Sequence, residues 1–301
     1  MKNSSAMSST ASDQEQLGIG KPQVNPFMKR GKSLVSKVSR ISDLKESISA
    51  SVEALGGFER IIDEGEKILV KPNFNTADPP PASSDPDFVK AVIELLYEHG
   101  AGKVILGESS TFSGCTRRVF EETGMTDKAG DAEIVFFEEG EYRKITTGGR
   151  FLKKVSIPDS SLKIDKLVNV SCIKTHQYAT FTLSLKNAVG FMKRNERLIS
   201  LHTRRLEEKI ADLNLIVHPV VTIMDGRKCF ISGGPACGEL REPGVILASG
   251  DRVAIDVEAI KIMQGYKGSS LTRDPWRYKQ VTQAVQLGLG SRNEEEYTVI
   301  E

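Results

Sequence analysis

Short apolar runs alternate with longer amphipathic segments through most of this 301-residue chain. Runs such as KILV at 67–70 and KVILG at 103–107 are too brief for helices and are typical of buried strands. Residues 86–98 instead repeat apolar side chains at helical spacing, with Asp85 as the candidate N-cap and Gly100 just past the end. The chain is therefore predicted to alternate strands with helices.

The same pattern continues in the second half, where strands are predicted at 165–173, 220–224 and 244–249 and a helix at 252–266. Residues 133–158 contain short runs around a Thr-Gly-Gly turn, which indicates antiparallel pairing. We therefore expect an α/β fold, a mainly parallel, doubly wound sheet with a small antiparallel addition.

Three segments differ in composition. Residues 1–32 are rich in Ser, Gln, Lys and Gly without apolar periodicity, which predicts a disordered leader. Residues 33–266 carry the α/β pattern and form the predicted domain. Residues 267–301, with a helical pattern from Trp276 onward, are expected to be a C-terminal helical extension that packs on the domain or on a second subunit.

Charge and hydropathy exclude several function classes. The 41 basic and 40 acidic side chains nearly cancel, which argues against a nucleic-acid partner. No apolar run approaches the roughly 20 residues that span a bilayer, and there is no apolar signal core, so we expect no membrane partner and a cytoplasmic location. Oligomeric state stays open, with a homo-oligomer and a redox partner both compatible with the sequence.

The four cysteines, at positions 115, 172, 229 and 237, contain no C-x-x-C pair and are expected to be reduced thiols. Cys172 lies in an apolar run and is expected to be a small buried side chain. Cys115 and Cys237 lie in Gly-rich loops, where a thiol can face a ligand.

Polar side chains follow four of the predicted strands at the point where each strand ends. They are Lys71 and Asn73, Glu108, Lys174 and His176, and Asp225. In open parallel sheets the ligand site lies beyond the carboxyl ends of the strands, so these groups are expected to meet. This placement favours an active site over a purely structural role.

Residues 174–187 hold Lys174, His176, Lys186 and Asn187 without any acidic residue. This composition predicts a site for an anion or a carbonyl group. Either lysine can give a point charge to a phosphate or carboxylate, and a desolvated lysine can act as a base or nucleophile. The alternative is that both lysines are solvated loop residues, as most lysines are.

A metal site is a second hypothesis. His176 and His202, with Glu108 and Asp225, would make a set suited to zinc, nickel or iron. The chain lacks H-x-x-x-H spacing, and lone histidines more often bond the backbone. Asp225 followed by glycine is also typical of a turn. The loop around Gly234 has the composition that lets backbone N–H groups approach an anion.

The segments KPNFN, GESS, KTHQYATFTLSLKN-x-x-G, DGRK, GGPACGE and GVILASGDRVAIDVEA occur in this order along the chain. Together they resemble the domain of unknown function 362, whose members are often called uncharacterised iron-sulfur-center proteins. The resemblance covers about residues 34–266. It implies functional roles for Lys71, Asn73, Lys174, His176, Lys186, Asn187, His202, Asp225 and Gly234.

Many members of that family carry a ferredoxin-like insertion whose cysteines bind a [4Fe–4S] cluster. The four cysteines here do not follow C-x-x-C-x-x-C-x-x-x-C-P, which argues against a built-in cluster. The family layout is also distantly similar to that of nickel-pincer lactate racemases, an analogy of fold only. For this chain a divalent metal is the remaining cofactor hypothesis.

Three functions remain open on the sequence alone. The first is an enzyme that acts on a small anionic molecule, in which Lys71, Lys174 and Lys186 bind negative groups and His176 moves a proton or binds a metal. In this reading Asn73 and Asn187 orient the substrate. The second is an iron-sulfur or metallocofactor-linked redox or delivery protein. The third is a non-catalytic domain that binds small anions with the same lysines.

Overall fold

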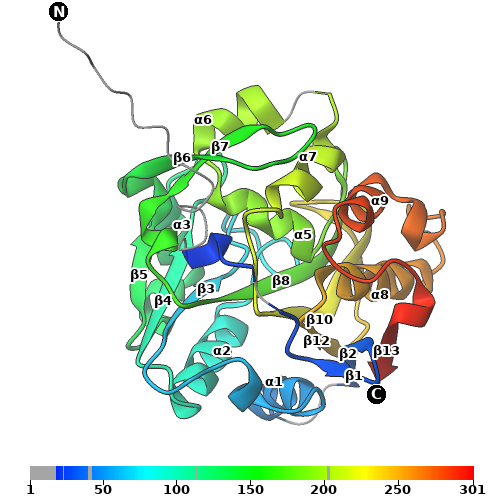
Figure 1. The fold of residues 1–301 in the computed structure, drawn as a ribbon, viewed down its shortest axis with the longest axis horizontal. Coiled ribbons are helices and arrows are strands. Elements are labelled where there is room, and N and C mark those ends of the chain that lie inside the picture. The colour runs from blue at the N-terminus through cyan, green and yellow to red at the C-terminus, as the bar shows by residue number, and fades with distance from the viewer. Residues whose placement is uncertain (1–17, 23, 40–42, 113, 202–203) are drawn as a thin grey trace, which may run out of the picture.

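The computed structural model describes residues 18–22, 24–39, 43–112, 114–201 and 204–301 (Figure 1). Its centre is one large sheet with the strand order β1-β2-β12-β10-β8-β3-β4-β5. The five strands from β10 to β5 are parallel to one another. They are β10 (Val221–Gly233), β8 (Lys166–His176), β3 (Lys67–Lys71), β4 (Lys103–Glu108) and β5 (Glu133–Phe136).

Antiparallel strands extend this parallel core on one side. Next to β10 lie β12 (Val245–Ser249) and then β2 (Lys32–Ser39), each antiparallel to its neighbour. Shorter strands pair at the margins, namely β1 (Met28–Lys29), β9 (Thr180–Thr182), β11 (Gly238–Arg241) and β13 (Tyr297–Ile300). The predicted mainly parallel α/β sheet is confirmed, as is the strand predicted over 244–249, but its antiparallel direction was not foreseen.

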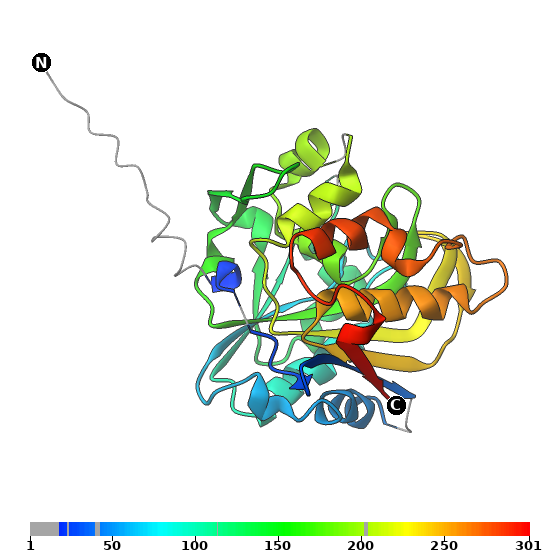
Figure 2. The same ribbon diagram turned by 45° about the vertical axis from the view of Figure 1, so that its right-hand side comes forward.

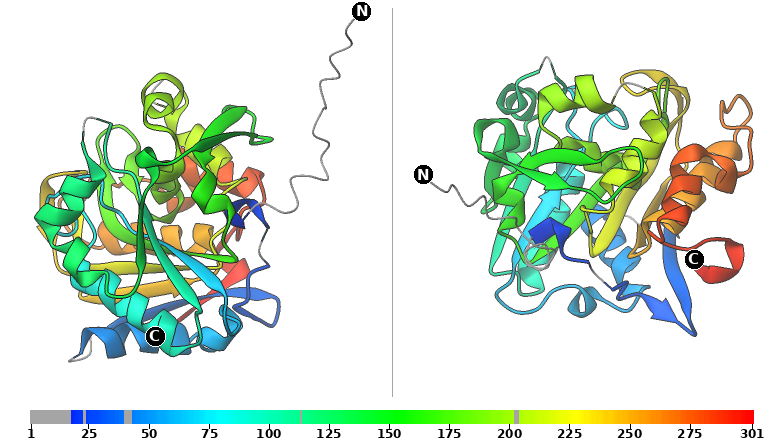
Figure 3. Two further views of the ribbon diagram at one scale, coloured as in Figure 1. Left: turned by 90° about the vertical axis from the view of Figure 1, so that its left-hand side faces the viewer. Right: turned by 45° about the horizontal axis from the view of Figure 1, so that its top comes forward.

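The predicted antiparallel addition is a separate two-stranded sheet of β6 (Tyr142–Thr146) and β7 (Lys154–Pro158). It lies beside α6 (Arg194–Glu196), where Glu196 accepts hydrogen bonds from the N–H and hydroxyl of Ser156 (Figures 1 and 3). The small sheet therefore supports the polypeptide that follows the predicted lysine and histidine segment.

Helices cover both faces of the large sheet (Figures 1 and 2). Alternate strand residues point to opposite faces, so Ile68 and Val70 join one core while Leu69 joins the other. The first core includes α1 (Leu44–Glu53) and α2 (Pro86–Glu98). The second includes α5 (Ser184–Asn187), α7 (Leu206–Leu213), α8 (Arg252–Gln264) and α9 (Lys279–Gln286).

Two short helices, α3 (Thr116–Thr123) and α4 (Met125–Lys128), connect β4 to β5. The predicted start of the helix over 86–98 is confirmed, and α8 begins in a similar way. Asp85 caps α2 by accepting a hydrogen bond from the Asp87 N–H, with Pro86 in the first turn. Asp251 caps α8 by accepting from Val253 and Ala254. These caps satisfy N–H groups that a helix leaves without internal partners.

Both ends of the chain contribute more to the domain than expected. Residues 1–17 of the predicted leader lie outside the described residues, but Ile19 and Phe27 are buried in the two cores and β1 joins the sheet. In the predicted C-terminal extension, α9 packs in the second core and β13 pairs in parallel with β2. Described residues on both sides of positions 32 and 266 therefore pack together.

Candidate functional site

Most of the polar residues that follow the predicted strands meet in one cavity of about 60 Å³. Because β3, β4 and β8 are parallel, their carboxyl ends lie at the same edge of the sheet. The predicted residues that line the cavity are Lys71, Asn73, Glu108, Lys174, His176, Lys186 and Asn187. The sequence did not single out the others, which are Asn75, Ser109, Thr182, Val189, Gly190, Arg197 and Pro235.

Lys71 and Glu108 form a buried ion pair across neighbouring strand ends, with 2.7 Å between Lys71 Nζ and Glu108 Oε1. Each side chain is 2% exposed. Glu108 also accepts hydrogen bonds from the backbone N–H groups of Phe74 and Ser109. Burial lowers the pKa of Lys71, and the charge of Glu108 opposes that shift. The pair fixes the loops after β3 and β4 around one side of the cavity.

A chain of hydrogen bonds connects Lys174 to two asparagines. Lys174 Nζ donates to Asn73 Oδ1 at 2.7 Å and to the carbonyl of Ala82. Asn73 Nδ2 donates in turn to Asn187 Oδ1 at 3.0 Å. Burial lowers the pKa of Lys174. The side chains of Asn73 and Lys174 therefore hold each other in place.

Both polar atoms of the Asn187 side chain form hydrogen bonds within the protein. Its Nδ2 donates to the carbonyls of Lys71 and Val170 and to Asn169 Oδ1 at 2.7 Å, and its Oδ1 accepts from Asn73. With 2% exposure, Asn187 joins β3, β8 and α5 beneath the cavity. The described contacts of Asn187 are all within the protein, and its predicted role of orienting a substrate stays a prediction.

Lys186 differs from the other cations of the cavity. Its Nζ has no hydrogen-bond or ion-pair partner among the residues that the structure describes, whereas Lys71 and Lys174 are held as above. The side chain is half-buried. Burial, reinforced by the positive charges of Lys174 and Arg197, lowers the pKa of Lys186 to about 7. Its amine is therefore about half neutral at neutral pH.

Asp256 positions Lys186 from beneath. It lies on α8 with no exposed surface, and its carboxylate accepts from the N–H groups of Ser184 and Leu185 at 2.8 and 3.1 Å. Burial raises the pKa of Asp256 to about 7. These bonds satisfy the first N–H groups of α5, the helix that carries Lys186. In the sequence, Asp256 is an acidic residue among the apolar positions of a predicted helix, and it was not among the predicted site residues.

Arg197 was also missed by the sequence interpretation. It is buried, and it donates to the carbonyls of Ser109, Ser110, Gly190 and Met192 at 2.8–3.0 Å. Burial lowers its pKa, opposed by Glu108. Its guanidinium binds carbonyls and no carboxylate in the described part of the chain, so its positive charge adds to that of the cavity. The signal in the sequence was weak, because Arg197 is the last residue of a charged segment, KRNER, typical of a solvated helix.

His176 lies on the same edge with its ring orientation fixed by the backbone. Its Nδ1 accepts hydrogen bonds from the N–H groups of Tyr178 and Ala179 at 3.1 and 3.2 Å. A nitrogen that accepts carries no proton, so the neutral ring has its proton on Nε2. His176 is 8% exposed and lines the cavity. This arrangement suits a residue that donates a proton through Nε2.

Thr182 supplies a further polar group to the cavity. Its hydroxyl is buried and has no hydrogen-bond partner within the described residues. Buried hydroxyls without a partner are costly and uncommon in proteins. The hydroxyl of Thr182 is therefore available to a ligand in the cavity.

Two predicted site residues, Asp225 and Gly234, do not line this cavity. Asp225 lines a separate cavity of about 500 Å³ and is paired with Arg227, 2.6 Å from its Oδ2. The physical reason is that β10 continues past Asp225, so this residue does not mark the end of a strand. Gly234 donates its N–H to the carbonyl of Cys237. A Cβ at Gly234 would lie within 2.0 Å of the carbonyl oxygen of Thr175, so the glycine allows its loop to pack against β8. His202 lies outside the described residues.

The predicted metal set of His176, His202, Glu108 and Asp225 is thus not assembled by the described structure. Glu108 and Asp225 are each paired with a cation. Within the described ranges, no group of three His, Cys, Asp or Glu side chains is arranged to hold a metal ion. The metal hypothesis stays a prediction that depends on His202.

The predicted burial of Cys172 is confirmed. Cys172 is buried, and burial raises the pKa of its thiol to about 11. Cys229 is buried as well, with a pKa raised by burial to about 12. Cys115 and Cys237 are exposed, and neither lines the 60 Å³ cavity. The cation-lined site is therefore built without a thiol.

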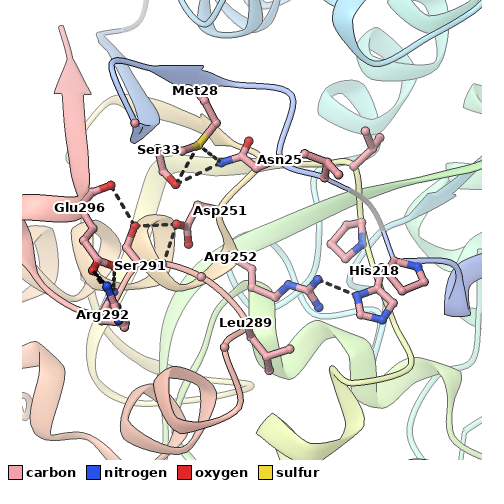
Figure 4. Close-up of a pocket in the computed structure, with 18 residues that line it drawn as sticks. Asn25, Met28, Ser33, His218, Asp251, Arg252, Leu289, Ser291, Arg292 and Glu296 are labelled. Atoms are coloured by element: carbon pink, nitrogen blue, oxygen red, sulfur yellow. Dashed lines mark hydrogen bonds and ion pairs between the residues drawn. The ribbon is translucent and has the colours of Figure 1, made fainter.

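A larger cavity, of about 640 Å³, lies at the opposite edge of the sheet beside the start of α8 (Figure 4). Its polar side chains bond one another, as Arg252 does with His218 at 3.1 Å and Arg292 with Glu296. Burial and the charge of Arg252 lower the pKa of His218 to about 4, so this histidine is neutral. No lysine is among the described residues that line this cavity, so it holds no amine like that of Lys186.

Gly190 sets the space around the Lys71–Glu108 pair. A Cβ at this position would lie 2.5 Å from Lys71 Cε and 2.8 Å from Glu108 Oε1. We expect Gly190→Ala to displace the pair and to lower the free energy of unfolding by about 1–3 kcal/mol in chemical denaturation. Gly265→Ala is the matched control, because its nearest atom would be 3.4 Å away. Equal stability of the two variants would contradict this account of Gly190.

The fold and site define an α/β protein with a small cation-rich cavity at the carboxyl edge of its sheet. The chain belongs to the family described as Domain of unknown function (DUF362), which matches residues 68–261. The resemblance inferred from the sequence motifs is thereby confirmed. A curated relative, the Thylakoid-associated protein sll1697 of Synechocystis sp. (strain ATCC 27184 / PCC 6803 / Kazusa), is 28% identical over 240 residues, which cover 77% of this chain and 73% of the relative.

Two solved structures are similar to this chain at low sequence identity. The lactate racemase apoprotein from Thermoanaerobacterium thermosaccharolyticum is 10% identical with a TM-score of 0.48, over 83% of this chain and 61% of that one. A structural-genomics crystal structure of a Thermotoga maritima protein is also 10% identical, with a TM-score of 0.44 over 81% and 58% of the two chains. The chain therefore spans about three fifths of each of these proteins. Separately, no described helix has the length and apolar character needed to cross a membrane.

Proposed function

We propose that this protein is an enzyme that acts on a small anionic substrate in the 60 Å³ cavity. The observation that carries the proposal is the amine of Lys186, which has no partner among the described residues. It lies beside two further cations, Lys174 and Arg197, that contact no carboxylate in the same part of the chain. The carboxylate of Glu108 is occupied by Lys71 and two backbone N–H groups. The cavity thus has an excess of positive charge that an anionic ligand would balance.

The residues divide into three roles in this proposal. Lys186 and Lys174 attract the negative group, Thr182 offers a hydroxyl, and His176 transfers a proton through Nε2. Arg197 adds positive charge while it holds the loop after β4. Asn73, Asn187 and Asp256 position the lysines. A catalytic lysine needs a lowered pKa near the working pH, which burial and neighbouring cations supply here.

Calorimetric titration of the full chain tests the anion site. Malonate, acetate and phosphate are the probes, and malonamide is the neutral analogue of malonate. We expect binding of at least one anion at one site per chain and no binding of malonamide. Lys186→Met should weaken anion binding about tenfold to a hundredfold, the effect of losing one hydrogen bond to a charged group.

Lys153→Met is the matched control, because Lys153 is exposed and does not line the cavity. Its anion affinity should equal that of the wild type. Equal binding of malonate and malonamide, or equal affinity of the Lys186 and Lys153 variants, would contradict the proposed site.

A further inference from the structure

The free amine of Lys186 points to a particular reaction class. Lys71 Nζ is bound to Glu108 and the carbonyl of Pro72, and Lys174 Nζ to Asn73 and the carbonyl of Ala82. Lys186 Nζ has no such partner among the described residues, although the side chain is half-buried and lines the cavity. An amine held in this way can approach an electrophile without first breaking a hydrogen bond.

The charged groups that surround Lys186 come from several elements. Lys174 lies on β8 and Arg197 in the segment after α6, and both disfavour a charge on Lys186. Glu108 on β4 is paired with Lys71 on β3. Asp256 on α8 bonds the N–H groups at the start of α5. Lysines with a cation nearby and limited solvent are those that react as neutral amines.

We infer that Lys186 forms an imine with the carbonyl carbon of a small oxo acid whose carboxylate is bound by the neighbouring cations. The inference rests on the proposed function and specifies its substrate class. A substrate with both groups matches the cavity, because one negative group can face Lys174 and Arg197 while the carbonyl faces Lys186. The small size of the cavity, about 60 Å³, restricts the acid to a few carbon atoms.

The reaction balances without an oxidant or reductant. The nitrogen lone pair of Lys186 attacks the carbonyl carbon, and the C–O π electrons move to oxygen. Transfer of a proton from nitrogen to that oxygen gives a carbinolamine. The C–O bond then breaks as the hydroxyl takes up a proton and leaves as water, and a C=N bond forms. The Nε2–H of His176 is a proton donor in the same cavity for this second step.

Reductive trapping tests the inference with the full chain. Pyruvate is the probe, sodium cyanoborohydride reduces any imine, and peptide mass spectrometry locates the adduct. We expect one adduct, at Lys186, formed at least about tenfold faster at pH 7 than at any exposed lysine. Roughly one exposed lysine amine in a few thousand is neutral at that pH, against about half for a lysine with a pKa of about 7.

Variants of Lys186 distinguish its role as a nucleophile from its role as a positive charge. Lys186→Arg keeps a cation but cannot form an imine, and it should lose the adduct while still binding pyruvate in calorimetry. Lys153→Met should label at Lys186 as the wild type does. An adduct that persists in Lys186→Arg, or that is spread over exposed lysines, would overturn the inference.

Failure of the inference and failure of the proposed function give different results. If pyruvate and malonate bind in calorimetry but no adduct forms at Lys186, the imine is wrong and the anion site stands. If neither pyruvate nor any of the other anions binds, both are wrong.

Discussion

Glu108→Ala is expected to lower the free energy of unfolding by about 3–5 kcal/mol, because it leaves the ammonium of Lys71 buried without its counter-charge. Both side chains are 2% exposed, so the remaining ammonium is far less hydrated than it would be at the surface. The backbone N–H groups of Phe74 and Ser109 would lose an acceptor as well. Urea denaturation of the wild type and the variant measures the difference.

Two further variants make this prediction specific to the buried pair. Glu139→Ala breaks an exposed ion pair with Arg117, in which both side chains are about half exposed, and should lower the stability far less than Glu108→Ala does. The double variant Lys71→Met with Glu108→Gln should be less destabilised than the sum of its single changes, because neither charge is left alone. Additive effects, or a loss in Glu108→Ala as small as that in Glu139→Ala, would show that the pair is not a buried unit.

Lys186→Met is expected to stabilise the protein at pH 7 by on the order of 3 kcal/mol, an effect that fades as the pH rises. The pKa of Lys186 is about 7 in the folded chain, against about 10.4 in an unfolded one. Between these values the unfolded state binds more protons at this lysine, so the wild type gains stability with rising pH. Below pH 7 the cost of the buried charge is fully present, and above about 10.4 it is gone.

Denaturation of the wild type, Lys186→Met and Lys153→Met at pH 7 and at pH 9.5 measures this linkage. The advantage of Lys186→Met should shrink to about 1 kcal/mol at the higher pH, while Lys153→Met should match the wild type at both. Taking the difference between variants removes the titration of other groups, which all three chains share. A constant difference at both pH values would mean that Lys186 titrates as an ordinary lysine.

The sequence predicted which side chains lie together where their position depends on strand ends. Lys71, Glu108, Lys174 and His176 all lie at or beyond the carboxyl ends of parallel strands, and the rule for open α/β sheets brought them together. Asp225 was placed with them by the same reasoning, but β10 continues beyond it. An apolar run shows where a strand is buried. It does not show how many of the polar residues that follow remain hydrogen-bonded to the neighbouring strand.

Local sequence patterns could not identify the residues that support the site. Asp256 reaches α5 from α8, 71 and 72 positions away from the N–H groups that it accepts from. Arg197 contacts loop carbonyls 87 and 88 positions earlier. In sequence both look like ordinary charged residues of helices, and only the packing of distant elements gives them a buried role. The antiparallel strands β12 and β2 were missed as sheet neighbours of β10 for the same reason.

The pKa of the Lys186 amine, measured with and without an anion, tests the central claim most directly. Nuclear magnetic resonance of lysine labelled at the side-chain amine follows each titration, and Lys186→Met assigns the signal. We predict a midpoint near 7 in the free protein and a higher midpoint with malonate bound, because the anion stabilises the ammonium form. A midpoint near the ordinary value of about 10.4, unchanged by malonate, would contradict the account of this cavity as an anion site built around a reactive lysine.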